Sequence, residues 1–98
     1  MENIATKVKI TKASSSKLSS VDFSNLTFGK VFTDHMMVCD YKDGSWQTPE
    51  IVPYGPLQMY PSAKVFHYGQ AVFEGMKSYK DDEDKVWLLD QSKILNVL

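Results

Sequence analysis

A cluster of prolines and glycines in the middle of the chain limits what the chain can fold into. Pro53, Gly55, Pro56 and Pro61 all fall between residues 53 and 61. Proline cannot continue a helix and cannot donate to an inner strand ladder, so this stretch is predicted to be a turn-rich connector with at most a short strand inside it. The chain before it and the chain after it must therefore build separate elements.

The residues before the connector have the pattern of a hairpin. Residues 31–41, "VFTDHMMVCDY", have no cleanly polar face, which predicts a strand buried on much of both faces. Asp43-Gly44 follows and is a strong hairpin turn pair, so "SWQTPEIVPYG" is predicted to return as a second strand. A second hairpin is predicted near the end of the chain, where "MKSYK" and "KVWLL" flank the acidic tip at residues 81–84.

The segment "FHYGQAVFEGMKSY", residues 66–79, combines aromatic residues with two glycines. On a helical wheel its apolar positions cover an arc of roughly 220°, much wider than the stripe of a surface helix. One buried helix is therefore predicted near residues 64–75, with Gly69 allowing a close approach and Gly75 ending the helix. Together with the hairpins, this makes the predicted fold class α+β.

Composition excludes several classes of function. The 98 residues suffice for one small domain, and the net charge of -1 gives no electrostatic case for nucleic acid or a membrane as partner. The eleven basic residues are all lysine, so the usual arginine clamp for a phosphate group is missing. With one cysteine, Cys39, and two histidines, His35 and His67, no metal site and no catalytic residue is predicted.

The first 20 residues are rich in Lys, Ser and Thr and are predicted to be a mobile or loosely docked amino-terminal arm. A signal peptide is excluded because an apolar h-region is missing. A mitochondrial presequence is disfavoured, since lysine replaces arginine and Glu2 adds an acidic residue. We therefore expect a cytoplasmic protein, and a single cysteine suits a reducing compartment.

From the residues alone, the interpretation stops at a small α+β unit whose function is undeclared. An aromatic helix wedged into a core is more often simply core than the wall of a binding site. His67 and Glu74 lie seven positions apart, about 10 Å along a helix axis, which is too far for a coupled catalytic pair.

Three longer words change this interpretation. "FGKVFTDHMMVCDY" (28–41), "IVPYGPLQMYPSA" (51–63) and "FHYGQAVFEGMKSY" (66–79) occur in this order at close spacing. Together they resemble the amino-terminal segment of the branched-chain amino acid aminotransferases, the fold-type-IV enzymes that use pyridoxal phosphate. The resemblance runs from about residue 22 to residue 89.

The resemblance implies a substrate pocket. In this family, aromatic residues of the small amino-terminal domain line the pocket for the branched side chain, and the matching positions are Phe28, Tyr68 and Phe73. It also implies leucine, isoleucine and valine, their 2-oxo acids and 2-oxoglutarate or glutamate as partners, pyridoxal 5'-phosphate as cofactor, and a homo-oligomer in the intact enzyme. Asp34, His35, Glu74 and Lys77 match family words too and are assigned a structural part.

The chain departs from the family pattern after "VWLL", where an Arg-Pro step is expected and "DQSKILNVL" stands instead. The predicted organisation is an arm at 1–20, an incomplete small domain at 21–90 and a divergent tail at 91–98. No lysine here matches the Schiff-base position, so a truncated piece that is inactive by itself is expected. Two alternatives stay open: an interaction module that pairs with an intact aminotransferase, and a related activity such as D-amino acid transamination or aminodeoxychorismate lyase chemistry.

Overall fold

The computed structural model describes residues 7–89 and 94–96, and the chain divides into two compact units, Met1–Gln58 and Met59–Leu98. Each unit is treated by itself below. Within the described part of the chain, no side chain is fully buried, and no helix has the length and apolar character needed to cross a membrane. Backbone hydrogen bonding therefore accounts for more of each unit's order than an apolar core does.

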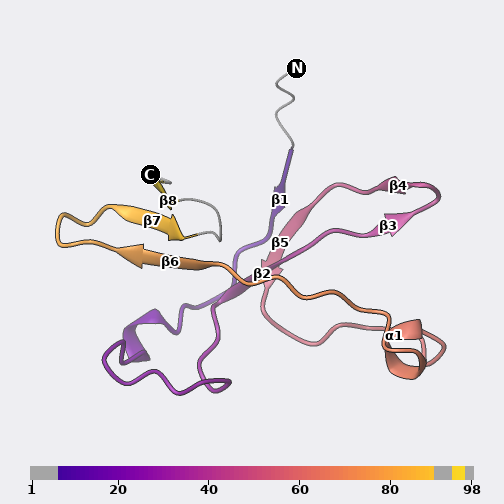
Figure 1. Cartoon of the computed structure of the whole chain (residues 1–98), viewed down its shortest axis with the longest axis horizontal. Coiled ribbons are helices and arrows are strands. Elements are labelled where there is room, and N and C mark those ends of the chain that lie inside the picture. The colour runs from indigo at the N-terminus through magenta and orange to yellow at the C-terminus, as the bar shows by residue number, and fades with distance from the viewer. Residues whose placement is uncertain (1–6, 90–93, 97–98) are drawn as a thin grey trace. The chain divides into compact units, whose positions relative to one another are not determined.

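The first unit is organised by a three-stranded sheet in the order β1-β5-β2 (Figure 1). The central strand β5 (Glu50–Pro53) pairs in parallel with β1 (Lys9–Ile10) and antiparallel with β2 (His35–Val38). His35 stands opposite Pro53 at one end of the β2–β5 ladder, and Val38 stands opposite Glu50 at the other. A short 3-10 turn, η1 (Leu18–Ser20), lies between β1 and β2 in the chain.

The hairpin predicted at Asp43-Gly44 is confirmed. β3 (Tyr41–Lys42) pairs antiparallel with β4 (Ser45–Trp46), and both turn residues have positive φ, 54° at Asp43 and 79° at Gly44. Two successive positive φ values are typical of the turn that matches the twist of a two-residue hairpin. Tyr41 and Trp46 then meet edge to face across the ladder, with ring centroids 5.2 Å apart.

The prediction of one continuous strand over residues 31–41, buried on much of both faces, is wrong. The structure has two strands there, β2 and β3, with different partners, and Met37 in the middle of β2 is 64% exposed. The return segment is interrupted in the same region at Pro49, which has no N–H to donate to a ladder. β2 therefore pairs with β5 beyond the interruption, while β3 pairs with β4 before it.

The second unit contains an antiparallel sheet in the order β6-β7-β8 (Figure 1). β6 (Lys77–Lys80) and β7 (Val86–Leu89) form the predicted second hairpin, and β8 (Ile94–Asn96) pairs with β7. The acidic residues 81–84 form the loop, as the sequence indicated.

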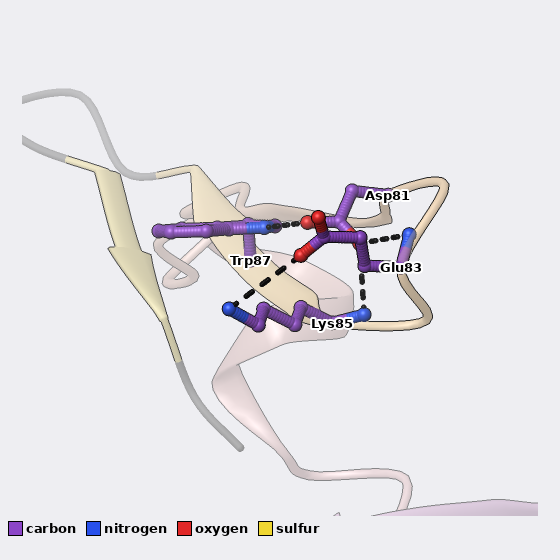
Figure 2. Close-up of polar contacts among 4 residues, drawn as sticks. All are labelled: Asp81, Glu83, Lys85 and Trp87. Carbon is purple, nitrogen blue, oxygen red and sulfur yellow. Dashed lines mark hydrogen bonds and ion pairs between the residues drawn. The ribbon is translucent and has the colours of Figure 1, made fainter.

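The loop of this hairpin is organised by one carboxylate, that of Asp81 (Figure 2). Its Oδ1 accepts the backbone N–H groups of Glu83 at 2.8 Å and Lys85 at 2.9 Å, and its Oδ2 accepts the indole N–H of Trp87 at 2.9 Å. The Trp87 bond, followed by that of Lys85, holds the pKa of Asp81 below its ordinary value of 3.8. These bonds link the loop to the side chain of Trp87 in β7.

The predicted buried helix near residues 64–75 is wrong in its extent and its burial. The only α-helix in the described residues, α1, covers Lys64–His67 and has no buried residue. Gly69 has a left-handed φ of 60°, which ends the helix six residues before Gly75 and gives Gly69 the helix-ending part assigned to Gly75. A helix gains most of its stability from packing, and no described side chain buries this wide apolar arc.

The predicted fold class, α+β, is confirmed: antiparallel hairpins dominate and one short helix accompanies them. The predicted boundaries at residues 20 and 90 stay predictions. Part of the predicted arm does enter the sheet as β1, and the two units divide at Gln58, inside the predicted domain 21–90.

The Asp81 loop generates the first prediction. Asp81→Ala removes all three hydrogen bonds, so amide exchange at Glu83 and Lys85 should accelerate by roughly tenfold. In the unchanged chain the same loss should appear with acid, because a carboxylate with a lowered pKa stabilises the hairpin above pH 3.8 and stops doing so as the pH falls through the lower folded-state value.

Hydrogen exchange followed by NMR measures both effects. Asp82→Ala is the matched control, since it removes an adjacent carboxylate that takes no part in the three bonds. Equal acceleration in the two variants would show that loop charge, and not these bonds, orders the hairpin.

Candidate functional site

The first unit contains an apolar cavity of about 700 Å³. It is formed within residues 17–34, between β1 and β2 in the chain. Its lining is mainly aliphatic and aromatic, from Leu18, Val21, Phe23, Leu26, Phe28 and Phe32. A cavity of this size and chemistry suits a small ligand with a hydrocarbon side chain.

Phe28 reaches this cavity from a tight turn. The N–H of Lys30 donates to the carbonyl of Thr27 at 3.1 Å, and Gly29 supplies the positive φ of 74° that such a turn requires at its third position. Phe28 occupies the second position and its side chain is fully exposed. It therefore contributes a rim of the cavity and not its floor.

The polar edge of the cavity is built around Asp34, which precedes β2. Its Oδ2 accepts the hydroxyl of Ser16 at 2.6 Å, and its Oδ1 accepts the backbone N–H of Lys17 at 2.9 Å. The hydrogen bond from Ser16, and after it the one from Lys17, keeps the pKa of Asp34 below the ordinary value of 3.8. Asp34 is thus an ionised acceptor at neutral pH, and it fixes the segment that supplies Lys17 and Leu18 to the cavity lining.

An aromatic stack supports the same region from Tyr54, the residue that follows β5. The rings of Phe32 and Tyr54 lie parallel with centroids 5.2 Å apart, and the N–H of Tyr54 donates to the carbonyl of Asp34 at 2.9 Å. The ammonium group of Lys17 lies 5.9 Å from the Tyr54 ring, within the range of a cation–π contact. The end of the β2–β5 ladder therefore sets the position of Phe32 and Asp34.

Tyr68 and Phe73, the other two predicted pocket residues, belong to the second unit. Tyr68 follows α1, donates its backbone N–H to the carbonyl of Lys64 at 2.8 Å and is 77% exposed. Phe73 lies in the irregular segment before β6 and is 93% exposed. Because the two units are described separately, the grouping of Phe28 with Tyr68 and Phe73 stays a prediction.

The described residues offer no cradle for a phosphorylated cofactor. Every described lysine is exposed, and the sequence has no arginine. A Schiff-base lysine needs a desolvated, charge-tuned surrounding, which an exposed strand or turn does not give. Nor do the described histidine, cysteine, aspartate and glutamate side chains form a group that could hold a metal ion.

Comparison with known proteins identifies relatives of this sequence. The sequence is 51% identical over 80 residues to branched-chain-amino-acid aminotransferase 2 of Bacillus subtilis, covering 81% of this chain and 22% of that protein. It is 56% identical over 68 residues to branched-chain-amino-acid transaminase 1 of the same organism, covering 68% and 19%. A probable branched-chain-amino-acid aminotransferase of Staphylococcus epidermidis is 48% identical over 81 residues, covering 82% and 22%.

Over most of its length, the sequence is similar to the branched-chain-amino-acid aminotransferases. The resemblance predicted from the three words is thereby confirmed. The chain spans about a fifth of the length of the curated relatives it matches, which agrees with the prediction of a partial segment. No family model matches the sequence.

Sequence reasoning missed most of the cavity. It identified Phe28 through the family word but not Leu18, Val21 or Phe23, which stand before and beside that word. It also gave no partner for residues 16–18 of the predicted arm, where Ser16 and Lys17 are hydrogen-bonded to Asp34. The sequence signal for this contact was a serine, Ser16, and an aspartate, Asp34, just before β2. Such a pair is too common in sequences to predict a specific contact.

The cavity generates the second prediction. Phe28→Ala should weaken the binding of 4-methylpentanoate, a branched carboxylate of leucine size, by roughly threefold to tenfold, because aromatic surface is lost from the rim. Ligand-detected NMR on the chain measures this affinity. Phe66→Ala removes an exposed aromatic ring from α1 in the second unit and is the control. The same weakening in both variants would remove Phe28 from the ligand site.

Proposed function

We propose that this segment is part of a branched-chain-amino-acid aminotransferase, which transfers the amino group between leucine, isoleucine or valine and 2-oxoglutarate. The observation that carries the proposal is the identity of 48–56% to three proteins of that name over most of this chain. The apolar cavity beside Phe28 supports it, since the substrates differ from other amino acids chiefly in their branched hydrocarbon side chains.

The part played by this segment is selection of the side chain. Transfer of a methyl-sized group from water to an apolar wall contributes about 0.8 kcal/mol, so a wall of aromatic and aliphatic side chains favours branched substrates over polar ones. We assign Phe28, Tyr68 and Phe73 to this wall. The charged side chains in the lining of the cavity are those of Asp34 and Lys17, at its edge.

The cofactor belongs to the proposal through the family, not through these residues. Pyridoxal phosphate supplies the electron sink that amino-group transfer requires. The exposed lysines and the missing arginine of this chain do not fit the group, so we place its binding on the part of the enzyme that these 98 residues do not include. The chain by itself should therefore show no transamination.

A second function is favoured by a specific observation. Val72 is fully exposed, Phe73 is 93% exposed, and Phe28 is exposed in the other unit, which is unusual for aromatic and branched side chains. Such surfaces suit an interaction module that pairs with an intact aminotransferase.

A homo-oligomeric assembly of the whole enzyme and its location in the cytoplasm are further parts of the proposal.

An exchange experiment tests the leading function. The 80 residues that match branched-chain-amino-acid aminotransferase 2 of Bacillus subtilis would replace their counterparts in that enzyme. A hybrid with leucine turnover within about tenfold of the parent would support the proposal. A hybrid that melts as cooperatively as the parent but no longer turns over leucine would contradict it, and capture of the intact parent by the separate chain would favour the interaction module.

The same hybrid gives the third prediction. Phe73→Ala should raise KM for leucine by about tenfold, because the side chain of the substrate loses an aromatic wall, while kcat changes less. Steady-state kinetics with leucine measures the change. Val72→Ala is the matched control, since Val72 is the adjacent residue and is equally exposed. Unchanged leucine kinetics in Phe73→Ala would remove Phe73 from the pocket.

A further inference from the structure

The two histidines of the chain make opposite hydrogen bonds with the same ring nitrogen. Nε2 of His35 lies 2.9 Å from the backbone nitrogen of Ala13, whose N–H can only donate. Nε2 of His67 lies 2.6 Å from the carbonyl oxygen of Pro61, which can only accept. His35 must therefore present a lone pair on Nε2, whereas His67 must present a proton there.

This difference fixes the protonation of His35. A neutral imidazole with an acceptor at Nε2 carries its proton on Nδ1, and a doubly protonated ring has no acceptor at all. Protonation thus removes the contact with Ala13 but leaves the contact between His67 and Pro61 intact.

The residue next to His35 holds the other end of the same segment. Asp34 accepts the hydroxyl of Ser16 at 2.6 Å and the N–H of Lys17 at 2.9 Å, and the Ser16 hydroxyl oxygen in turn lies 3.1 Å from the N–H of Leu18. Lys17 and Leu18 line the apolar cavity. Two adjacent side chains at the start of β2 therefore tie down residues 13–18, from Ala13 to the cavity wall.

We propose that Asp34 and His35 are a pair of positioning residues that hold residues 13–18, of which Lys17 and Leu18 line the apolar cavity, and that protonation of His35 releases the Ala13 end of this segment. The pair is called the arm latch below. That the cavity receives a substrate side chain rests on the proposed function; the latch itself does not.

The charged groups around the latch are few. Asp34 is the residue before His35. On the arm, Lys17 follows Ser16, whose hydroxyl donates to Asp34, and Lys12 precedes Ala13. Across the sheet, the partner of His35 in β5 is Pro53, which does not titrate, and Glu50 lies at the far end of the ladder in an ion pair with Lys9 at 3.8 Å. Protonation of His35 removes its contact with Ala13 but neither of the two hydrogen bonds that Asp34 accepts, so release should begin at Ala13.

The tautomer of His35 is the direct test. Long-range ¹H–¹⁵N NMR spectra of the chain distinguish a proton on Nδ1 from one on Nε2, and both histidines appear in one spectrum. The latch requires the Nδ1–H form at His35 and the Nε2–H form at His67 near neutral pH. An Nε2–H tautomer at His35 would overturn the proposal, whatever the state of the rest of the chain.

The release step is tested by amide exchange at Ala13. Its protection factor should fall by about tenfold or more between about pH 8 and about pH 5, while that of Lys17 changes less. In His35→Gln, whose amide oxygen can accept but does not titrate, protection at Ala13 should persist and lose its pH dependence. In His35→Ala it should be low throughout, and His67→Gln should leave the wild-type profile unchanged.

These outcomes separate the latch from the proposed function, because none of the measurements uses a substrate or a cofactor. A pH profile at Ala13 that is the same in His35→Gln as in the wild type would overturn the latch and leave the aminotransferase proposal intact. Loss of leucine turnover in the exchange experiment, with the Nδ1–H tautomer present, would contradict the proposed function and leave the latch intact.

Discussion

The antiparallel ladder between β2 and β5 is the interaction on which the first unit depends. It joins residues 35–38 to residues 50–53, and β1 adds to its outer edge. In a chain whose described side chains are nowhere fully buried, this ladder replaces an apolar core as the source of long-range order. Its end at His35 and Pro53 is also where Tyr54 bonds the carbonyl of Asp34.

The cavity and the contacts of the arm lie at this end of the ladder, because the ladder fixes Asp34 and His35 there. Asp34 and His35 are neighbours, yet each holds a different part of the arm, Asp34 through Ser16 and Lys17 and His35 through Ala13. The arm then supplies Leu18 to the cavity, and Phe32 reaches it from the other side of Asp34. The start of β2 thus positions two parts of the cavity lining, Leu18 on the arm and Phe32 just before Asp34.

Features encoded by neighbouring residues were predictable from the sequence, and features that need a distant partner were not. Asp43-Gly44 forms its turn because the two residues adopt positive φ by their own chemistry. The family words likewise identified Phe28, since they are contiguous. The predicted extent of the helix was wrong because its wide apolar arc needs a covering layer of other side chains. Without such a layer the helix covers only Lys64–His67 and ends at Gly69. The contacts of the arm were not predictable because Ser16 and Ala13 find partners about twenty positions away.

The same distinction applies to the predicted pocket residues, of which Phe28 lines the cavity while Tyr68 and Phe73 lie in exposed segments of the other unit. The cavity beside Phe28 is complete within residues 17–34 and needs only the strand end that orients it. Phe73, by contrast, has no described layer against it, and a side chain that is 93% exposed has little to fix its direction. A segment that is about a fifth of its relatives' length can therefore order one apolar cavity by hydrogen bonds, while its exposed aromatic residues outside that cavity have little to fix their direction.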